Sequence, residues 1–263
     1  MKITLNNEFY KRLTTSLILI IILIAMFFLG NLGIYVMVVV LSYLSFLEIY
    51  KLKISKVKLQ LHLPFIMLSY FVISETGILD LNNSVLLVIF YTLTSTYVII
   101  NLFENLNFHF SIVGFLINST FFSIVYIITN QDLEYKLIFI IIAIISLCDI
   151  FAYLLGKKFG KFKIFPKISP NKTLEGYLGG TFCCLLLFVV ILFYYNLIDL
   201  NWILYVIIII ISSFVGDLYI SFFKRKLNIK DLGKLFPGHG GVLDRIDSWL
   251  FTFPLSFLLL QFN

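Results

Sequence analysis

Long runs of apolar residues, separated by short polar stretches, dominate the chain. A helix needs about 20 mostly apolar residues to cross the hydrocarbon core of a bilayer. Nine runs approach or reach this length and predict nine membrane-spanning helices. They are Leu13–Gly30, Ile34–Tyr50, Leu61–Ile78, Val85–Leu102, Phe108–Ile128, Leu137–Leu155, Leu178–Leu197, Trp202–Phe223 and Ser248–Leu260. The last run is short, and the third contains Glu75, which is compatible with a bent or partly interfacial helix.

Composition supports this interpretation. Of 263 residues, 60% are hydrophobic and 13% are charged, and the mean hydropathy is +1.02. These values exclude a soluble enzyme, a disordered chain and a disulfide scaffold. Strands of a membrane barrel alternate in polarity over roughly 10 residues, unlike these continuous runs. The predicted fold is therefore an all-α integral membrane protein. Residues 1–263 are predicted to form one polytopic membrane domain, with N-terminal spans in 1–135 and the spans and loops of the candidate site, described below, in 136–263.

The basic residues test the number and direction of the spans. With nine spans, every Lys and Arg except Lys136 falls on one side, out of 20 in the chain. The positive-inside rule places that side, and the N-terminus, in the cytoplasm, and the C-terminus outside. The first run has no small-residue cleavage site behind it, so it is predicted to be a retained span of a multi-pass plasma-membrane protein.

The net charge of +6 does not indicate a nucleic-acid partner. In a membrane protein it indicates orientation, anionic lipid or a phosphorylated ligand. Cys148, Cys183 and Cys184 lie in apolar stretches without metal-type spacing, so they are interpreted as small hydrophobic residues.

Two cytoplasmic loops, at 156–176 and 224–247, are long and rich in Gly, Pro and basic residues. Each follows a span that contains an acidic residue, Asp149 before the first and Asp217 before the second. A carboxylate within a span is costly, so it is by default a functional candidate.

The second loop combines acids with helical spacing. Asp217, Ser221 and Lys224 are spaced i, i+4, i+7 and are predicted to share one helix face. Asp244 and Asp247 share a face if a helix begins near Val242. Carboxylates from two helix ends are suitable ligands for Mg²⁺.

The same loop contains a glycine-rich stretch and several cations. The segment Pro237-Gly238-His239-Gly240-Gly241 permits close approach of backbone N–H groups to a phosphate. Lys224, Arg225, Lys230 and Arg245 supply positive charge. Phosphoryl and nucleotidyl transfer require these parts. The alternatives are a structural ion-pair network for the acids, headgroup binding for the cations, and a structural hydrogen bond for His239.

The first loop provides a second candidate anion site. Ser169-Pro170 is expected at a helix start, with Lys172 and Thr173 exposed on the first turn. Glu175 is expected to cap that turn or to pair with a lysine. Lys157, Lys158 and Lys161 either bind a lipid phosphate at the interface or only set orientation.

The stretch from Ser221 to Asp247 fits the pattern S-x-x-K-R-x4-K-D-x-G-x2-F-P-x-H-G-G-x2-D-R-x-D. This resembles the phosphatidate cytidylyltransferases, also called CDP-diacylglycerol synthases. The segments from Asp149 to Lys161 and from Ser169 to Gly176 are similar to the same family. The sequence departs from it at Leu174, where the family often has Trp, and at Ile150-Phe151.

The resemblance implies transfer of a cytidylyl group from CTP to phosphatidate, giving CDP-diacylglycerol and pyrophosphate. It implies a dimeric helical membrane bundle with a polar cytoplasmic-side cavity, a requirement for Mg²⁺, and a second cation, K⁺. The resemblance implies that Asp217 and Asp244 carry a paired-cation site. We expect the catalytic residues to be Asp217, Asp244, Lys224, Arg245 and His239. The residues expected to bind CTP and phosphate are Ser169, Lys172, Ser221, Arg225, Lys230, Gly240 and Gly241. The metal ligands are Asp217 and Asp244, with Asp247 sharing the metal or orienting Arg245.

Two other functions are compatible with the residues. One is a different CTP-dependent transferase, which acts on another lipid phosphate or phosphorylates a lipid alcohol. The other is an ion-coupled transporter that uses Glu75, Asp149 and Asp217. The sequence shows neither the paired repeats nor the broken helices common in transporters.

Overall fold

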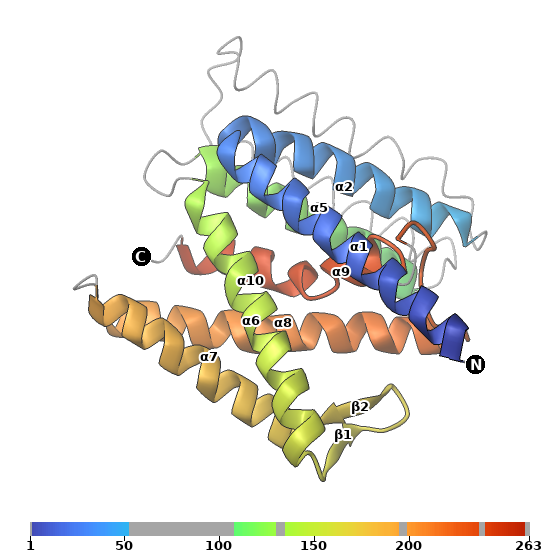
Figure 1. Cartoon of the computed structure of the whole chain (residues 1–263). Coiled ribbons are helices and arrows are strands. Elements are labelled where there is room, and N and C mark those ends of the chain that lie inside the picture. The colour runs from blue at the N-terminus through green and yellow to red at the C-terminus, as the bar shows by residue number, and fades with distance from the viewer. Residues whose placement is uncertain (1, 53–107, 130–134, 195–198, 237–239, 261–263) are drawn as a thin grey trace. The chain divides into compact units, whose positions relative to one another are not determined.

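A computed structural model describes residues 2–52, 108–129, 135–194, 199–236 and 240–260 (Figure 1). These residues form mostly helices, together with one two-stranded hairpin. The chain divides into two compact units. The first consists of Met1–Phe122 and Leu232–Asp244, and the second of Ser123–Asp231 and Arg245–Asn263.

The first unit contains two helices joined by a tight turn, α1 (Lys2–Phe28) and α2 (Asn31–Lys51). Gly30 has φ +61°, a left-handed conformation that glycine adopts without steric cost. At Gly33 a Cβ atom would lie 2.2 Å from the carbonyl oxygen of Met26, so the turn depends on a missing side chain there as well. The helix α5 (Phe108–Thr129) begins in this unit and ends in the second.

The second unit is built around α6 (Lys136–Phe159), α7 (Leu174–Tyr194) and α8 (Leu200–Lys226). It also contains α10 (Trp249–Leu260), which packs against α8. The short α9 (Leu243–Ile246) lies at the boundary between the units.

Small residues bring α6 and α7 close together. A Cβ on Gly176 would lie 2.7 Å from the carbonyl oxygen of Ala152, and a Cβ on Gly180 would lie 2.7 Å from the backbone nitrogen of Ala152. Gly176 and Gly180 have the G-x-x-x-G spacing that permits close helix packing in membranes. Backbone contact at this interface therefore sets how closely α6 and α7 approach each other.

An antiparallel hairpin of β1 (Lys163–Phe165) and β2 (Ser169–Thr173) connects α6 to α7. The expectation that Ser169 and Lys172 open a helix is therefore wrong, because α7 begins at Leu174. The carboxylate of Glu175 accepts the backbone N–H groups of Lys161 and Phe162, and Thr173 Oγ1 accepts that of Gly176. These contacts fix the hairpin beside the start of α7.

Four described helices are long and apolar enough to cross a membrane, namely α2, α6, α7 and α8. These helices coincide with four of the predicted spans, and their length and apolar composition are those of a membrane protein. Shorter apolar stretches, at Leu13–Phe28, Ile112–Ile128 and Trp249–Leu260, correspond to the first, fifth and ninth predicted spans. The third and fourth predicted spans, with Glu75, lie outside the described residues, so the number nine stays a prediction.

Candidate active site

The ammonium group of Lys172 on β2 forms an ion pair with the carboxylate of Asp217 on α8. Ser221, one turn further along α8, donates its hydroxyl hydrogen to the other oxygen of Asp217 at 3.2 Å. The predicted common helix face of Asp217 and Ser221 is thus confirmed, and the hairpin adds a cation to it. The side chains of Lys172 and Asp217 are 21% and 22% exposed, so the pair is accessible but partly desolvated.

Burial lowers the pKa of Lys172 to about 8, while the negative charges of Asp247 and Asp149 act in the opposite direction. The ammonium group also lies over the rings of Tyr177 and Phe214, 5.5 and 5.8 Å from their centroids. Lys172 is therefore a charged donor in a partly apolar setting, where a phosphate interaction is stronger than in water.

Asp247 contributes a second carboxylate to this unit. Its backbone lies against α8, since a Cβ on Gly216 would be 2.5 Å from the carbonyl oxygen of Asp247. Burial raises the pKa of Asp247, and the charges of Lys224, Lys172 and Arg245 oppose that shift. Lys172, Lys224 and Arg245 thus lie near enough to Asp247 to influence its ionisation.

Arg225, which was predicted to bind a phosphate, contacts backbone carbonyl groups. Its Nε donates to the carbonyl oxygen of Ile168 at 3.2 Å, and its Nη1 donates to that of Ile229 at 3.5 Å. The guanidinium therefore ties the hairpin to the C-terminal end of α8. The remaining predicted residues of this unit are placed as follows: Ser169 is half-buried on β2, and Lys230 and Arg245 are exposed.

Asp244 belongs to the first unit and is buried. One of its oxygens, Oδ2, accepts the backbone N–H groups of Leu232 and Gly241, both at 2.9 Å. The expectation that Asp244 and Asp247 share a helix face is wrong, because α9 is a single turn that ends at Ile246.

The two described residues of the glycine-rich segment, Gly240 and Gly241, donate their N–H groups to acceptors within the protein. Gly240 has φ +85°, and its N–H donates to the carbonyl oxygen of Phe236 at 3.1 Å. The next N–H, that of Gly241, donates to Asp244. The predicted open cradle for a phosphate at Gly240 and Gly241 is therefore closed by the protein's own acceptors. His239 lies outside the described residues.

Glu48, near the end of α2, is a residue that the sequence analysis missed. Its carboxylate is buried and accepts the N–H groups of Val242 and Leu243 at 2.7 and 3.0 Å. The available signal was an acid within a predicted span, the same criterion that selected Asp149 and Asp217.

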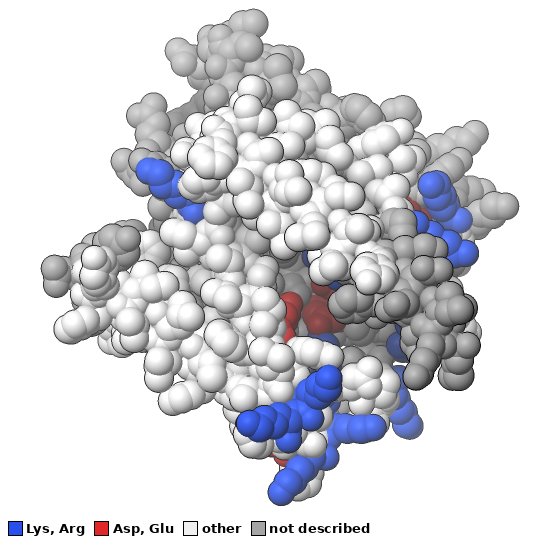
Figure 2. All heavy atoms as spheres, in the orientation of Figure 1, with Lys and Arg blue, Asp and Glu red and all other residues white. Residues whose placement is uncertain are grey.

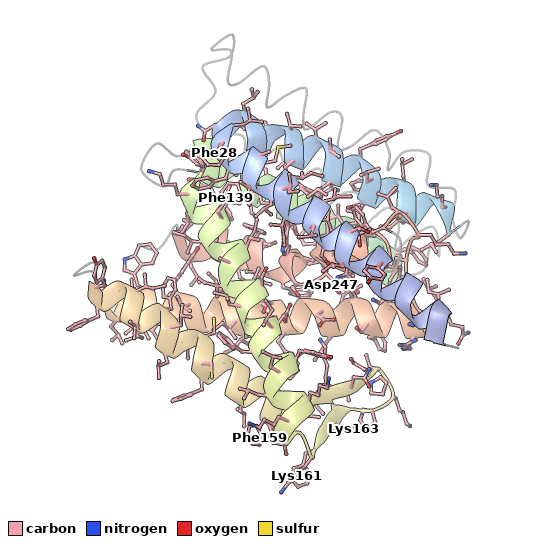
Figure 3. All side chains as sticks on the ribbon, in the orientation of Figure 1. Phe28, Phe139, Phe159, Lys161, Lys163 and Asp247 are labelled. Carbon is pink, nitrogen blue, oxygen red and sulfur yellow. The ribbon has the colours of Figure 1, made fainter. Side chains whose placement is uncertain are left out.

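The hairpin end of the second unit is strongly basic. Exposed lysines gather there, as Figure 2 shows at the bottom of the view, and Figure 3 labels Lys161 and Lys163 beside Phe159. Phe159, Phe162 and Phe165 are also exposed. The exposed lysines of this end are Lys157, Lys158, Lys161, Lys163 and Lys167. Lysines interleaved with exposed aromatic rings suit a lipid headgroup region.

Within the described residues, no group of three His, Cys, Asp or Glu side chains is placed to hold a metal ion alone. Mg²⁺ in nucleotide-dependent enzymes is usually bound through one or two carboxylates plus substrate phosphates and water. Asp217 and Asp247 of the second unit therefore fit this ion by donor type, in the presence of a nucleotide.

Comparisons with known proteins agree with the motif. The sequence model of the cytidylyltransferase family matches residues 10–263. A phosphatidate cytidylyltransferase of Staphylococcus aureus (strain COL) is 48% identical over 122 residues, covering 44% of this chain and 46% of that protein. The enzyme of the same name from Staphylococcus saprophyticus is 41% identical over 141 residues, 53% of this chain and 54% of that protein. The chain thus spans about half the length of the curated relatives that it matches.

Proposed function

Because this chain belongs to the cytidylyltransferase family, we propose that it transfers a cytidylyl group from CTP to phosphatidate at the membrane. The products are CDP-diacylglycerol and pyrophosphate. The observation that carries the proposal is the association of Lys172, Asp217 and Ser221, with Lys224 and Asp247 in the same unit. The CTP donor and the phosphatidate acceptor are both anionic. Cationic side chains can neutralise their phosphates, and carboxylates can hold a metal ion that does the same.

In the proposed reaction, a phosphate oxygen of phosphatidate attacks the α-phosphorus of CTP. A new P–O bond forms, the bond from the α-phosphorus to the bridging oxygen breaks, and pyrophosphate leaves. The attacking oxygen is already anionic, so no strong general base is needed. Catalysis then depends on positioning and on neutralising charge between the two anions.

The second unit supplies the proposed binding groups. Lys172, Lys224 and Arg245 would hold substrate phosphates, and Ser221 would keep the Asp217 carboxylate oriented through its hydrogen bond. Arg225 would act indirectly, by holding the hairpin that carries Lys172. His239 and Lys230 remain proposed phosphate contacts on the strength of the motif alone.

We propose that Asp217 and Asp247 hold Mg²⁺ together with CTP, and that Asp244 contributes as the resemblance implies. When bound, Mg²⁺ would supply positive charge against the nucleotide phosphates. A second cation, K⁺, and a homodimer also stay proposals that rest on the resemblance. The same is true of a plasma-membrane location with the active site facing the cytoplasm, which the distribution of basic residues supports.

Radiolabelled CTP distinguishes cytidylyl transfer from phosphorylation of a lipid. Purified protein in detergent is given phosphatidate and CTP labelled at either the α- or the γ-phosphate. Transfer of the α label to the organic phase supports the proposed reaction. Transfer of the γ label indicates a CTP-dependent lipid kinase, and transfer of neither, with intact folded protein, contradicts both. Diacylglycerol and other lipid phosphates, tested in place of phosphatidate, define the acceptor.

A further inference from the structure

Glu48 makes contacts that are unusual for an acid near the end of an apolar helix. Its side chain is only 6% exposed, and both carboxylate oxygens are used. One accepts the N–H of Val242 and the other that of Leu243, across 194 and 195 residues of sequence. These two residues immediately precede Asp244.

The surrounding backbone is shaped to admit this carboxylate. A Cβ on Gly241 would lie 2.5 Å from both oxygens of Glu48, and a Cβ on Gly233 would lie 2.3 Å from one of them. Real Cβ atoms do not approach other atoms so closely, so both positions must lack a side chain while Glu48 is in place. The φ angle of neither residue requires glycine. Their role here is therefore to make room for Glu48.

Glu48 and Asp244 together hold one segment of backbone. Asp244 accepts the N–H groups of Leu232 and Gly241, and Glu48 accepts those of the next two residues. All of these contacts lie within the first unit. Three consecutive donors, at 241–243, and the N–H of Leu232 are thus satisfied by two buried carboxylates, which fixes the backbone immediately before Asp244.

We propose that Glu48 is a positioning residue for Asp244: it holds the segment 241–243 so that the Asp244 carboxylate has one fixed orientation for the reaction. This inference rests on the proposed function. Glu48 acts through the backbone and does not touch substrate. A displacement of about 1 Å in a positioned group can cost about 100-fold in rate, so a small movement of this segment suffices.

The first test is hydrogen–deuterium exchange of the full-length protein in detergent, read on peptides that cover residues 240–250. Glu48→Gln loses one of the two acceptors, and Glu48→Ala loses both. Faster exchange at Val242 and Leu243 is expected in both variants, with a larger effect for Ala. Ser45→Ala is the matched control, because Ser45 is fully buried on the same helix and donates its hydroxyl hydrogen within that helix, to the carbonyl oxygen of Leu41. Unchanged exchange in Glu48→Ala overturns the inference without bearing on the proposed function.

The second test is steady-state kinetics, normalised to folded protein. For Glu48→Ala we expect kcat to fall about 10- to 100-fold while the KM for CTP changes less than about threefold. A merely structural role would lower the melting temperature and leave kcat per folded molecule unchanged, which overturns positioning. Absence of cytidylyl transfer in the wild type contradicts the proposed function instead, and the exchange test still applies.

A double-variant cycle provides the third test. Gly241→Ala places a methyl group against Glu48 and should reduce kcat in the wild-type background. In the Glu48→Ala background the methyl group meets no carboxylate, so the second substitution should add less than about a twofold loss. Additive losses would show that Gly241 acts independently of Glu48, and would overturn the proposed packing role.

Discussion

Lys172 and Asp217 are paired across 45 residues of sequence, from the second strand of the hairpin to the middle of α8. The pair joins the first loop that the sequence singled out to the helix that precedes the second. It places an ammonium group on the carboxylate that is the strongest candidate for binding a metal. Any cation that binds Asp217 must therefore share or displace Lys172, which would then be available for a phosphate.

Removing the Asp217 charge should stop the reaction without preventing folding. For Asp217→Asn we expect turnover to fall at least about 1,000-fold, because the variant loses a carboxylate proposed to hold Mg²⁺, and a positive charge placed against the transferring phosphate contributes several kcal/mol in such sites. Transfer of α-labelled cytidylyl into lipid measures this. Asp199→Asn is the control, since Asp199 caps the N-terminus of the same helix and asparagine caps equally well. Comparable activity in both variants would contradict a catalytic role for Asp217.

Deprotonation of Lys172 should lower the activity of the enzyme at alkaline pH. With a pKa of about 8, the side chain is charged below that pH and loses its proton above it. Since only the charged form attracts a phosphate, kcat/KM is expected to decline above about pH 8. Lys172→Arg should keep the positive charge and move the decline in kcat/KM to higher pH. Lys172→Met, which has no charge, should have a low kcat/KM at every pH. Identical pH profiles for the wild type and Lys172→Arg would exclude Lys172 as the titrating group.

Close packing of α6 and α7 predicts a large effect of one methyl group. Gly180→Ala places a Cβ 2.7 Å from the backbone nitrogen of Ala152, which cannot move away easily, and should destabilise the protein by about 1–3 kcal/mol. The neighbouring Gly179→Ala is a stringent control, because the atom nearest to its Cβ is the flexible end of the Leu155 side chain. Thermal unfolding in detergent measures both variants. Equal melting temperatures would show that the helices tolerate separation.

The basic end of the hairpin should favour anionic membranes. Replacing Lys161, Lys163 and Lys167 by Gln removes three exposed charges, each worth about 1 kcal/mol near an anionic surface. In nanodiscs we expect the apparent KM for phosphatidate to rise several-fold, with kcat little changed. The corresponding triple Arg variant keeps the charge and should behave as the wild type. A loss in kcat alone would place these lysines in a catalytic role instead.

The sequence alone predicts much of the helical content of this protein. Apolar runs long enough to span a bilayer correspond to α2, α6, α7 and α8, because a helix in lipid must satisfy its backbone internally and expose apolar side chains. Helical spacing also places Ser221 beside Asp217, since residues four apart on one helix are neighbours. The motif from Ser221 to Asp247 indicates the family, which the match over residues 10–263 confirms.

Tertiary structure decides what the polar loops do. Ser169 to Thr173 pair with Lys163 to Phe165 as a strand. Glu175 accepts the N–H groups of Lys161 and Phe162, and Thr173 accepts that of Gly176, contacts on either side of the strand pair that periodicity does not reveal. Glu48 accepts the N–H of Val242 across 194 residues, immediately after the glycine-rich segment, and Asp244 accepts the N–H of Gly241, so a donor expected to bind phosphate is satisfied internally. Local spacing determines which residues share a helix face, whereas the partners of buried donors depend on how distant parts of the chain pack.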